Sequence, residues 1–481
     1  MGPFYVNADG TTLYENVFAW NRYANVLYLE SPIGTGFSYS KKNVFYSDAN
    51  DDQTLSQNYK ALTDFFTNVQ PQYKDRPFFI GAESYGGITA PMLADKIIQG
   101  INDGSFPNKN FQGMSIGNGY MDIPLIENTL VLWSEYHGRF SLDEWAAIKK
   151  DCCANGDVDN CDFYQHFKSA TQLDFSPDDT ACGKHFSSII GKEVDPSLDP
   201  YNFYQDCYGG SAITYFDKKP RRRMQTQPST AAVADPKNNP FARYPLGGNT
   251  ADFINRDSTD NQFGYPCLQE NYVTQYFNNE DNQKAWNIDS SFKKANRTFA
   301  DCNDALYNKY KVKYTNQDTQ FASIIKNNMN PNFTILVYNG DIDTVCNYLG
   351  DSKFIDKVYK AFQATKPKTA PTVSSRDRWI YRTMTAGWVQ SYQLSNVKID
   401  VLTVKGAGHL VPLSRPGPVY QMITNFMQHS PSYSETNMEV TPTPNPLLST
   451  TTKGAAGGIF TYISCFATLF VISIFTYINA L

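Results

Sequence analysis

The stretch FFIGAESYGG, residues 78–87, decides the fold. Its apolar run breaks into a turn of small residues with Ser84 at the crest. A buried strand that ends in a tight strand-to-helix turn around a serine is the layout of a nucleophile elbow. The usual pattern is Gly-x-Ser-x-Gly, whereas this chain has Ala82 two residues before the serine. The stretch predicts a strand, a turn that presents Ser84, and a helix. An ordinary turn serine is the alternative.

A nucleophilic serine requires a base that takes its proton. Of the five histidines, His409 follows the β-branched run KIDVLTV at 398–404, which predicts a buried strand, and stands in the turn KGAGHLVP. Open α/β sheets carry their chemistry just past the carboxyl ends of strands. His429 stands in a polar stretch and is interpreted as solvated. His409 is therefore the predicted base.

An acid that orients the base should end another strand. The stretch TILVYNGDIDTVCNYLGD, residues 334–351, supplies a strand at Ile335–Tyr338 with Asp341 and Asp343 in the following loop. We favour Asp343 because it lies further into the loop, and we expect Asp341 to bond backbone amides of the same turn. The order Ser, Asp, His along the chain is that of the α/β-hydrolases.

The sequence resembles the serine carboxypeptidases, the family that includes cathepsin A and carboxypeptidase Y, over residues 2 to about 430. The resemblance implies an α/β-hydrolase fold: a mostly parallel twisted sheet with a helical, disulfide-bonded cap insertion. It also implies that Ser84, Asp343 and His409 form a triad that releases the carboxyl-terminal residue of a peptide through an acyl-enzyme. The stretches that carry it are GPFYVNADGTTLYENVFAWNRYANVLYLESPIGTGFSYS (2–40), GAESYGG, MSIGNGYMD (114–122), YNGDIDTVCNYLGD (338–351) and AGWVQSYQL through KGAGHLVP (386–412).

The resemblance assigns further roles beside the triad. Tyr85, the residue after the nucleophile, supplies an oxyanion-hole amide. Glu83 and Glu30 hold the terminal carboxylate of the substrate and pair with each other. Two carboxyl groups in contact share a proton near mild acidity, because both cannot ionise cheaply. A protonated glutamate donates to a substrate carboxylate, so we expect peptidase activity to be favoured at acidic pH.

One segment of the family pattern is not found. The second oxyanion amide comes in the family from Trp-Leu-Asn-Gly-Gly-Pro-Gly-Cys-Ser-Ser, upstream of Gly-Pro-Phe, and this sequence opens Met1-Gly2-Pro3-Phe4. In the family that segment also carries the strand between those of NVLYLE and RPFFIGAE, so we expect a gap there with unpaired backbone groups. Two alternatives to the peptidase stay open: a catalytically inactive binding or protective homologue, and an acyltransferase.

Nine cysteines leave one without a partner if the others pair. The resemblance implies bonds between Cys152 and Cys182, between Cys153 and Cys161, and between Cys207 and Cys267. It leaves Cys346 free and buried in the acid loop, Cys302 without its family partner and Cys465 in an apolar tail. Disulfides of this kind indicate an oxidising compartment.

Composition and charge exclude some classes of function. A net charge of −5 offers no basic surface for nucleic acid. No pair of histidines has the spacing of metal ligands, so we expect neither a metal nor another cofactor. Peptides are the expected partners, and the resemblance adds a homodimer.

Residues from about 125 to 330 lose the alternation of strands and helices, which predicts a cap insertion. Within it, the polar stretch 217–240 is expected to be a mobile loop, and Arg221–Arg223 would suit cleavage of the chain there.

The end of the chain has its own pattern. A Ser/Thr/Pro-rich stalk is expected at 431–458 after a catalytic domain at 1–430. The 23 residues at 459–481 carry no charge and reach about 35 Å as a helix, enough for a hydrocarbon core of about 30 Å, which predicts a transmembrane or lipid-anchor segment. The sequons at Asn296 and Asn332 suit a glycoprotein of the secretory pathway. We therefore expect a membrane-anchored protein in the lysosomal lumen or at the cell surface.

Overall fold

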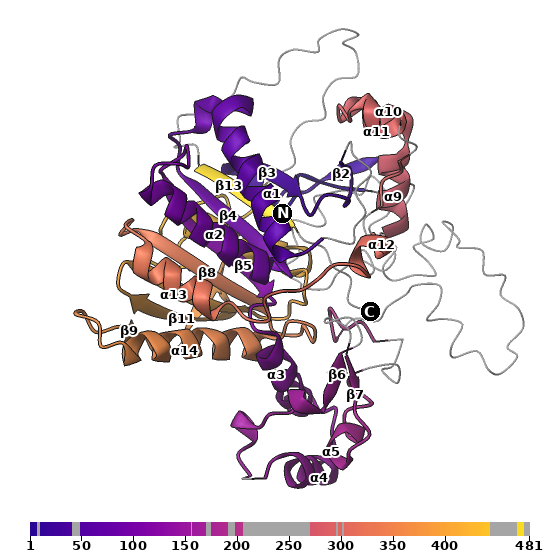
Figure 1. Cartoon of the computed structure of the whole chain (residues 1–481), viewed down its shortest axis with the longest axis vertical. Coiled ribbons are helices and arrows are strands. Elements are labelled where there is room, and N and C mark those ends of the chain that lie inside the picture. Colours follow the sequence, from indigo (N-terminus) through magenta and orange to yellow (C-terminus); the bar gives the residue numbers. More distant parts are fainter. Residues whose placement is uncertain are drawn as a thin grey trace, which may run out of the picture.

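The computed structural model describes all of the chain except residues 7–9, 41–48, 155, 170–174, 191–197, 205–269, 295–296, 301–302, 443–468 and 476–481. A sheet of nine strands forms its centre (Figure 1). The strand order is β10-β11-β12-β8-β5-β4-β13-β3, and β9 pairs with β11. The strands are β3 (Ala24–Glu30), β4 (Phe78–Ser84), β5 (Phe111–Gly119), β8 (Phe333–Gly340), β9 (Thr372–Val373), β10 (Asp377–Tyr381), β11 (Met384–Leu394), β12 (Val397–Val404) and β13 (Leu469–Phe475).

The sheet is mixed. The strands from β12 to β3 run parallel, whereas β9, β10 and β11 pair antiparallel. Successive strand residues point to opposite faces, and both faces of the central strands are apolar. Ile80 of β4 therefore joins the core on one side and its neighbour Phe79 joins the core on the other. Because these central strands run parallel, their carboxyl ends meet at one edge of the sheet, which is where open α/β sheets carry their ligands and catalytic residues.

Helices cover both faces of the sheet. Four of them pack against the face that carries Ile80, and Figure 1 shows them side by side in front of the strands: α1 (Asp51–Asp64), α2 (Gly86–Asn102), α13 (Asp318–Asn327) and α14 (Tyr348–Ala364). The core of the other face includes residues of α16 (Pro416–Met427) and, from the short α15 (Val411–Ser414), Val411. Smaller elements lie around the early strands: β1 (Phe4–Val6), β2 (Leu13–Glu15), η1 (Trp20–Arg22), the π-helical turn η3 (Phe65–Val69) and η4 (Pro71–Tyr73).

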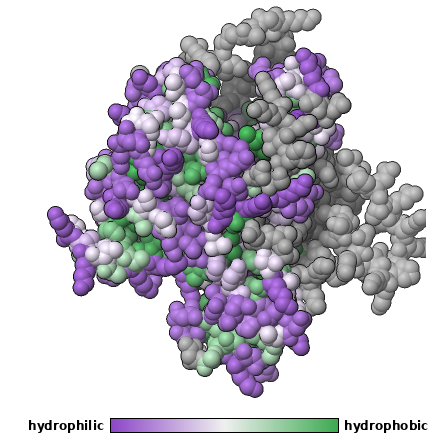
Figure 2. All heavy atoms as spheres, viewed as in Figure 1, coloured by the Kyte–Doolittle hydropathy of each residue, from purple (hydrophilic) through white to green (hydrophobic). Residues whose placement is uncertain are grey.

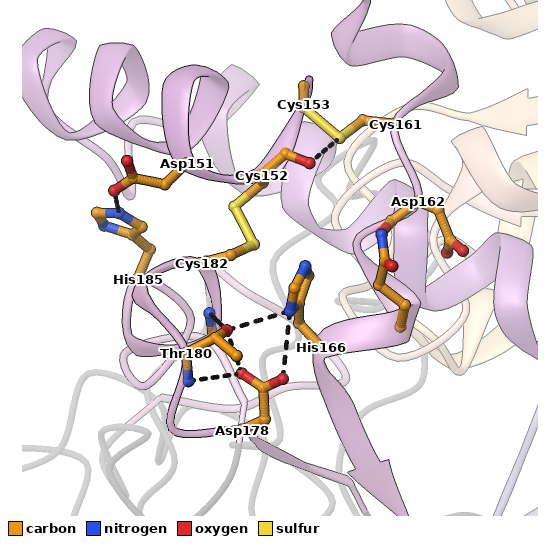
Figure 3. The surroundings of a disulfide bond; sticks show 12 residues. Asp151, Cys152, Cys153, Cys161, Asp162, His166, Asp178, Thr180, Cys182 and His185 are labelled. Atoms are coloured by element: carbon orange, nitrogen blue, oxygen red, sulfur yellow. Dashed lines mark hydrogen bonds and ion pairs between the residues drawn. A yellow bond between two sulfur atoms is a disulfide. The ribbon is translucent and has the colours of Figure 1, made fainter. Parts of the chain in front are cut away.

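The part of the insertion between β5 and β8 that the structure describes is mostly helical, and its first segments have a small core of their own. The disulfides Cys152–Cys182 and Cys153–Cys161 join its segments there, and Figure 3 shows the ion pair of His185 with Asp151 beside them. Its elements are α3 (Ile123–Tyr136), α4 (Leu142–Cys152), η5 (Val158–Asn160), η6 (Tyr164–His166), β6 (Phe167–Ser169), β7 (Phe175–Pro177), α5 (Ala181–Lys184), α9 (Glu270–Asn278), α10 (Glu280–Ala285), α11 (Ser290–Lys294) and α12 (Asp304–Tyr307).

The expected gap between β3 and β4 is filled. The strand β13, drawn in yellow in Figure 1, lies between them and pairs parallel with both. The prediction that these two strands lack a shared neighbour is therefore wrong for this structure. A short apolar run rich in β-branched residues, such as LFVISIF, fits a fully buried strand as well as a helix, because periodicity does not separate the two.

The anchor predicted over 459–481 is not supported. Its described part is the strand Leu469–Phe475, and in the ranges that the structure describes no helix combines the length and the apolar character needed to cross a bilayer. The face drawn in Figure 2 is mostly hydrophilic, with apolar residues in small patches. Length and hydropathy alone suggested the anchor. Neither property shows whether a segment pairs with the strands on both sides of it.

The predicted stalk begins too early in the sequence. Tyr433 is buried and donates from its hydroxyl to Asp400 at 2.7 Å, and Met438 packs with Val17 and Tyr420. Residues 431–442 thus belong to the domain. The remaining calls on Cys207, Cys267, Cys302, Cys465, Asn296 and the loop 217–240 lie outside the described residues.

The pairing of β13 predicts that Ser473→Pro destabilises the protein. Ser473 lies opposite Tyr28 of β3 and Gly81 of β4, and proline removes its N–H from the ladder. Leaving a buried partner unsatisfied costs about 1 to 3 kcal/mol. We expect a lower midpoint of thermal unfolding, measured by circular dichroism. Ser473→Thr keeps the N–H and is the control. Equal midpoints for the two variants would contradict the pairing.

Candidate active site

Ser84 lies in the turn that the sequence predicted. It ends β4 with a φ of 58°, in the left-handed region, and α2 begins two residues later. Its carbonyl accepts a hydrogen bond from Tyr120 N at 2.9 Å. A Cβ on Gly87 would clash with the backbone of Gly119 and Tyr120, so only glycine lets α2 approach β5 this closely. A serine with this strained backbone at a strand-to-helix turn has the geometry of a nucleophile elbow.

Asp343 and His409 are in direct contact. Asp343 Oδ2 lies 2.6 Å from His409 Nδ1, and both side chains are buried. Burial lowers the pKa of His409, but the charge of Asp343 and the hydrogen bond to it outweigh burial, so the pKa of His409 is raised above its ordinary value. The carboxylate thus holds the imidazole with Nδ1 toward the acid and leaves Nε2 for other chemistry.

The other aspartate of the acid loop has a different partner. Asp341 Oδ1 accepts a hydrogen bond from Gly406 N at 2.7 Å, in the loop that precedes His409. The expectation that Asp341 bonds backbone amides of its own turn does not describe this contact, because the Gly406 amide belongs to the base loop. Asp341 therefore joins the acid and base loops, while Asp343 reaches the imidazole.

Cys346 connects the serine with the other two residues. Its thiol interacts with the Ser84 hydroxyl. Ligand atoms of Cys346, Asp343 and His409 all lie within 4.8 Å of one another. Ser84, Asp343 and His409 thus gather at the carboxyl ends of β4, β8 and β12, three strands that are far apart in the sequence.

The sequence did not single out two residues that support this cluster. Asn118, with a φ of 39°, donates from Nδ2 to Asp343 Oδ2 at 2.7 Å and accepts from Gly340 N at 3.0 Å. Asp51, fully buried at the start of α1, accepts the hydroxyl of Tyr85 at 2.6 Å. For Asn118, the available signal was an asparagine between two glycines in MSIGNG. Asp51 gave no separate signal, because an acidic residue in the first turn of a helix is common.

Glu83 and Glu30 lie on either side of β13. Both pair in register with Phe475, and among the described contacts they make no hydrogen bond to each other. Glu30 Oε2 instead accepts from Phe37 N at 2.9 Å, in the loop after its own strand. Burial raises the pKa of Glu83 to about 7, and burial also raises that of Glu30. Two neighbouring strand spacings of about 4.8 Å each explain why the expected contact is not made.

The sequon residue Asn332 is exposed at the start of β8. The next residue, Phe333, is buried and begins the strand. A glycan on Asn332 would therefore point into solvent, away from the site at the opposite end of β8.

Comparison with known proteins agrees with this geometry. A family model described as serine carboxypeptidase matches residues 1–429. The chain belongs to the serine carboxypeptidase family. It is 43% identical to serine carboxypeptidase ctsa-3.1 of Caenorhabditis elegans, an alignment that covers 98% of this chain and 84% of the relative. It is 32% identical to the lysosomal protective protein of Mus musculus, over 89% of this chain and 79% of that protein.

A solved structure shares the fold. The prohormone-processing carboxypeptidase Kex1(delta)p of Saccharomyces cerevisiae matches with a TM-score of 0.55 and 17% identity, over 88% of this chain and 78% of that one. Together, the family model and the curated relatives support a carboxypeptidase function, so this serine carboxypeptidase is a hydrolase.

The contact of Asn118 with Asp343 predicts that Asn118→Gly lowers kcat. Glycine tolerates the positive φ but removes the donor to a charged carboxylate, an interaction worth about 1.5 to 3 kcal/mol. We expect kcat to fall roughly 10- to 100-fold with little change in KM. Asn287→Gly is the matched control, because Asn287 is exposed and has a φ of 56°. Equal kcat values in the two variants would count against the contact.

Proposed function

We propose that Ser84, His409 and Asp343 are the catalytic triad of a carboxypeptidase that acts through an acyl-enzyme. The observation that carries the proposal is the buried 2.6 Å contact of Asp343 with His409 at the same sheet edge as Ser84. A strained serine at a strand-to-helix turn adds to it.

The residues divide the reaction in the following way. His409 Nε2 takes the proton of the Ser84 hydroxyl as Oγ attacks the carbonyl carbon of the last peptide bond. Asp343 stabilises the imidazolium that forms. The backbone N–H of Tyr85 faces the developing oxyanion, and the side chain of Tyr85 is fixed by Asp51. His409 then gives the proton to the leaving amine. Water attacks the acyl-enzyme ester while His409 takes a proton from it, and His409 returns that proton to Ser84 Oγ as the acid leaves.

Glu83 is proposed to recognise the free carboxylate of the substrate. It adjoins Ser84, is 5% exposed, and its Oε2 has no hydrogen-bond partner in the described structure. Burial raises its pKa to about 7, so the side chain is neutral in mild acid. A neutral carboxyl donates a hydrogen bond to the substrate carboxylate, whereas an ionised one repels it. Glu30 is left out of this role, because its Oε2 already accepts a hydrogen bond from Phe37 N.

The disulfides, one sequon and the name of one relative also bear on where the protein is located in the cell. The disulfides Cys152–Cys182 and Cys153–Cys161 suit an oxidising compartment. Asn332 is exposed for glycosylation. One relative is named lysosomal protective protein. We therefore place the protein in the secretory pathway, with the lysosomal lumen as a destination consistent with a carboxyl group that must stay protonated.

The triad predicts that a fluorophosphonate labels Ser84 and that Asp343→Asn lowers kcat by about 10⁴-fold, because the imidazole is no longer held in the productive tautomer. Asp341→Asn is the matched control, since Asp341 bonds backbone amides such as Gly406 N and not the imidazole, and we expect it to keep kcat within about tenfold. Labelling followed by mass spectrometry and hydrolysis of a blocked dipeptide are the measurements.

Two other outcomes identify the alternatives. No adduct at Ser84 in the folded natural protein would indicate a catalytically inactive binding or protective homologue. An adduct with transfer of the acyl group to an added alcohol, and no release of an amino acid, would indicate an acyltransferase.

The role of Glu83 predicts a change in pH dependence. Above its pKa of about 7 the group is charged, so kcat/KM of the wild-type enzyme for peptides should fall as pH rises through that value. Glu83→Gln cannot ionise, so its kcat/KM should persist on the alkaline side. Glu30→Gln should keep the wild-type profile. Substrates with an amidated terminus provide a second comparison, and an unchanged alkaline limb in Glu83→Gln would disprove the role.

A further inference from the structure

A short segment of the insertion lies directly over the acid and base loops. It consists of residues Leu198–Tyr204, which we call the clip segment. Asp199 and Asn202 within it are 3% and 6% exposed. Backbone groups of Pro200, Tyr201 and Phe203 in this segment bond the two loops that carry Asp343 and His409.

The clip segment bonds the acid loop on both sides of Asp343. Pro200 O accepts from Thr344 N at 3.0 Å and from Thr344 Oγ1 at 2.7 Å, and Phe203 N donates to Ile342 O at 3.0 Å. These three hydrogen bonds fix the residues immediately before and after the acid. Any displacement of the clip segment would therefore move the backbone that aims the carboxylate.

The clip segment also bonds the base itself. Tyr201 O accepts from His409 N at 2.6 Å, and the Tyr201 ring lies 4.9 Å from the imidazole, centroid to centroid, at 47°. A Cβ on Gly408 would clash with Tyr201 O and with Asn202, so the base loop can accept the clip segment only because residue 408 is glycine. The clip segment thus contacts the acid loop and the base loop together.

A helix of the insertion anchors the clip segment. The Phe203 ring packs edge to face on Trp133 of α3 at 5.2 Å, and Trp133 Nε1 donates to Asp341 O at 3.3 Å. The clip segment thus contacts the acid loop, the base loop and α3.

We propose that the clip segment Leu198–Tyr204 is a positioning element for the acid–base pair, with Tyr201 setting the imidazole and Asp199 as a charged group within the same segment. The inference rests on the proposed roles of Asp343 and His409. Asp199 is held by its own turn, where Oδ1 accepts from Tyr201 N at 3.0 Å.

Asp199 is one of several groups that face His409. The others are Asp343 and Cys346 of the acid loop, Glu83 beside the nucleophile and Asp351 at the start of α14. The charges of Asp343, Glu83 and Asp199 all raise the pKa of His409. Removing the charge of Asp199 without changing its shape should therefore lower that pKa.

The test compares Asp199→Asn, Tyr201→Ala and Tyr201→Phe in the full chain with a blocked dipeptide substrate. For Asp199→Asn we expect the acidic limb of kcat/KM, which reports the free-enzyme base, to move to lower pH. For Tyr201→Ala we expect kcat to fall about tenfold or more with KM changed less than threefold, and for Tyr201→Phe we expect near wild-type kcat because the ring remains. Asp122→Asn removes a carboxylate buried elsewhere, beside Lys357, and should leave the acidic limb in place.

The outcomes separate this inference from the function on which it rests. An acidic limb that coincides with the wild type in Asp199→Asn, together with unchanged kcat in Tyr201→Ala, would overturn the positioning role. That result would hold even if both variants unfold at lower temperature, since a purely structural segment changes stability without moving the limb. Absence of phosphonate labelling of Ser84 in the wild type would overturn the proposed function itself. Gly408→Ala is not used alone, because its clash threatens folding.

Discussion

The Asp343 carboxylate is the constraint on which the rest of the site depends. It is fully buried, and its two oxygens accept hydrogen bonds from Val345 N at 2.9 Å, Cys346 N at 3.2 Å and Asn118 Nδ2 at 2.7 Å, in addition to the contact with His409. A buried charge that lost these donors would cost several kcal/mol. The loop after β8, the end of β5 and the loop after β12 must therefore keep their relative positions for the fold to be stable. The arrangement that stabilises the charge is also the one that directs the imidazole.

The positions of Ser84, Asp343 and His409 were largely predictable, because each follows a short local sequence pattern. A buried strand followed by small residues indicated the turn of Ser84, and β-branched runs before polar turns indicated the strands that end at Asp343 and His409. Parallel strands bring such ends to one edge whatever their separation in the chain. The prediction of the cluster thus needed only the strands and their direction. The choice of Asp343 over Asp341 followed from the position of each along the same loop, and Asp343 is the one that contacts His409, whereas Asp341 contacts Gly406 N.

What the sequence did not predict depends on pairing between distant segments. Nothing within LFVISIF says that its neighbours are β3 and β4 and not lipid, because both environments favour the same apolar residues. Glu30 was assigned to the substrate, yet its carboxylate is held by the loop of Phe37, where a Cβ on Gly36 would clash with it. The clip segment gave no pattern of its own, since its function lies in backbone groups of Pro200 and Tyr201 that any sequence carries. These contacts are specified by the assembled fold, so a linear pattern does not contain them.

The two titratable groups beside Ser84 make the substrate part of the proton balance. The positive charge of His409 lowers the pKa of Glu83, and the negative charge of Glu83 raises that of His409. A single proton held by this pair has two placements: on His409, with Glu83 ionised, or on Glu83, with the imidazole neutral. These forms contain the same number of protons, so pH alone does not choose between them.

On the proposed roles, only the second form has both a free base and a neutral carboxyl that accepts an anionic substrate terminus. A bound carboxylate next to Glu83 disfavours its ionised form and thereby draws the proton from His409. Binding of the correct end of a peptide would then generate the base that attacks it. A ligand without a free carboxylate would leave the proton on the imidazole. Selectivity for the chain terminus is in this way coupled to the chemistry as well as to binding.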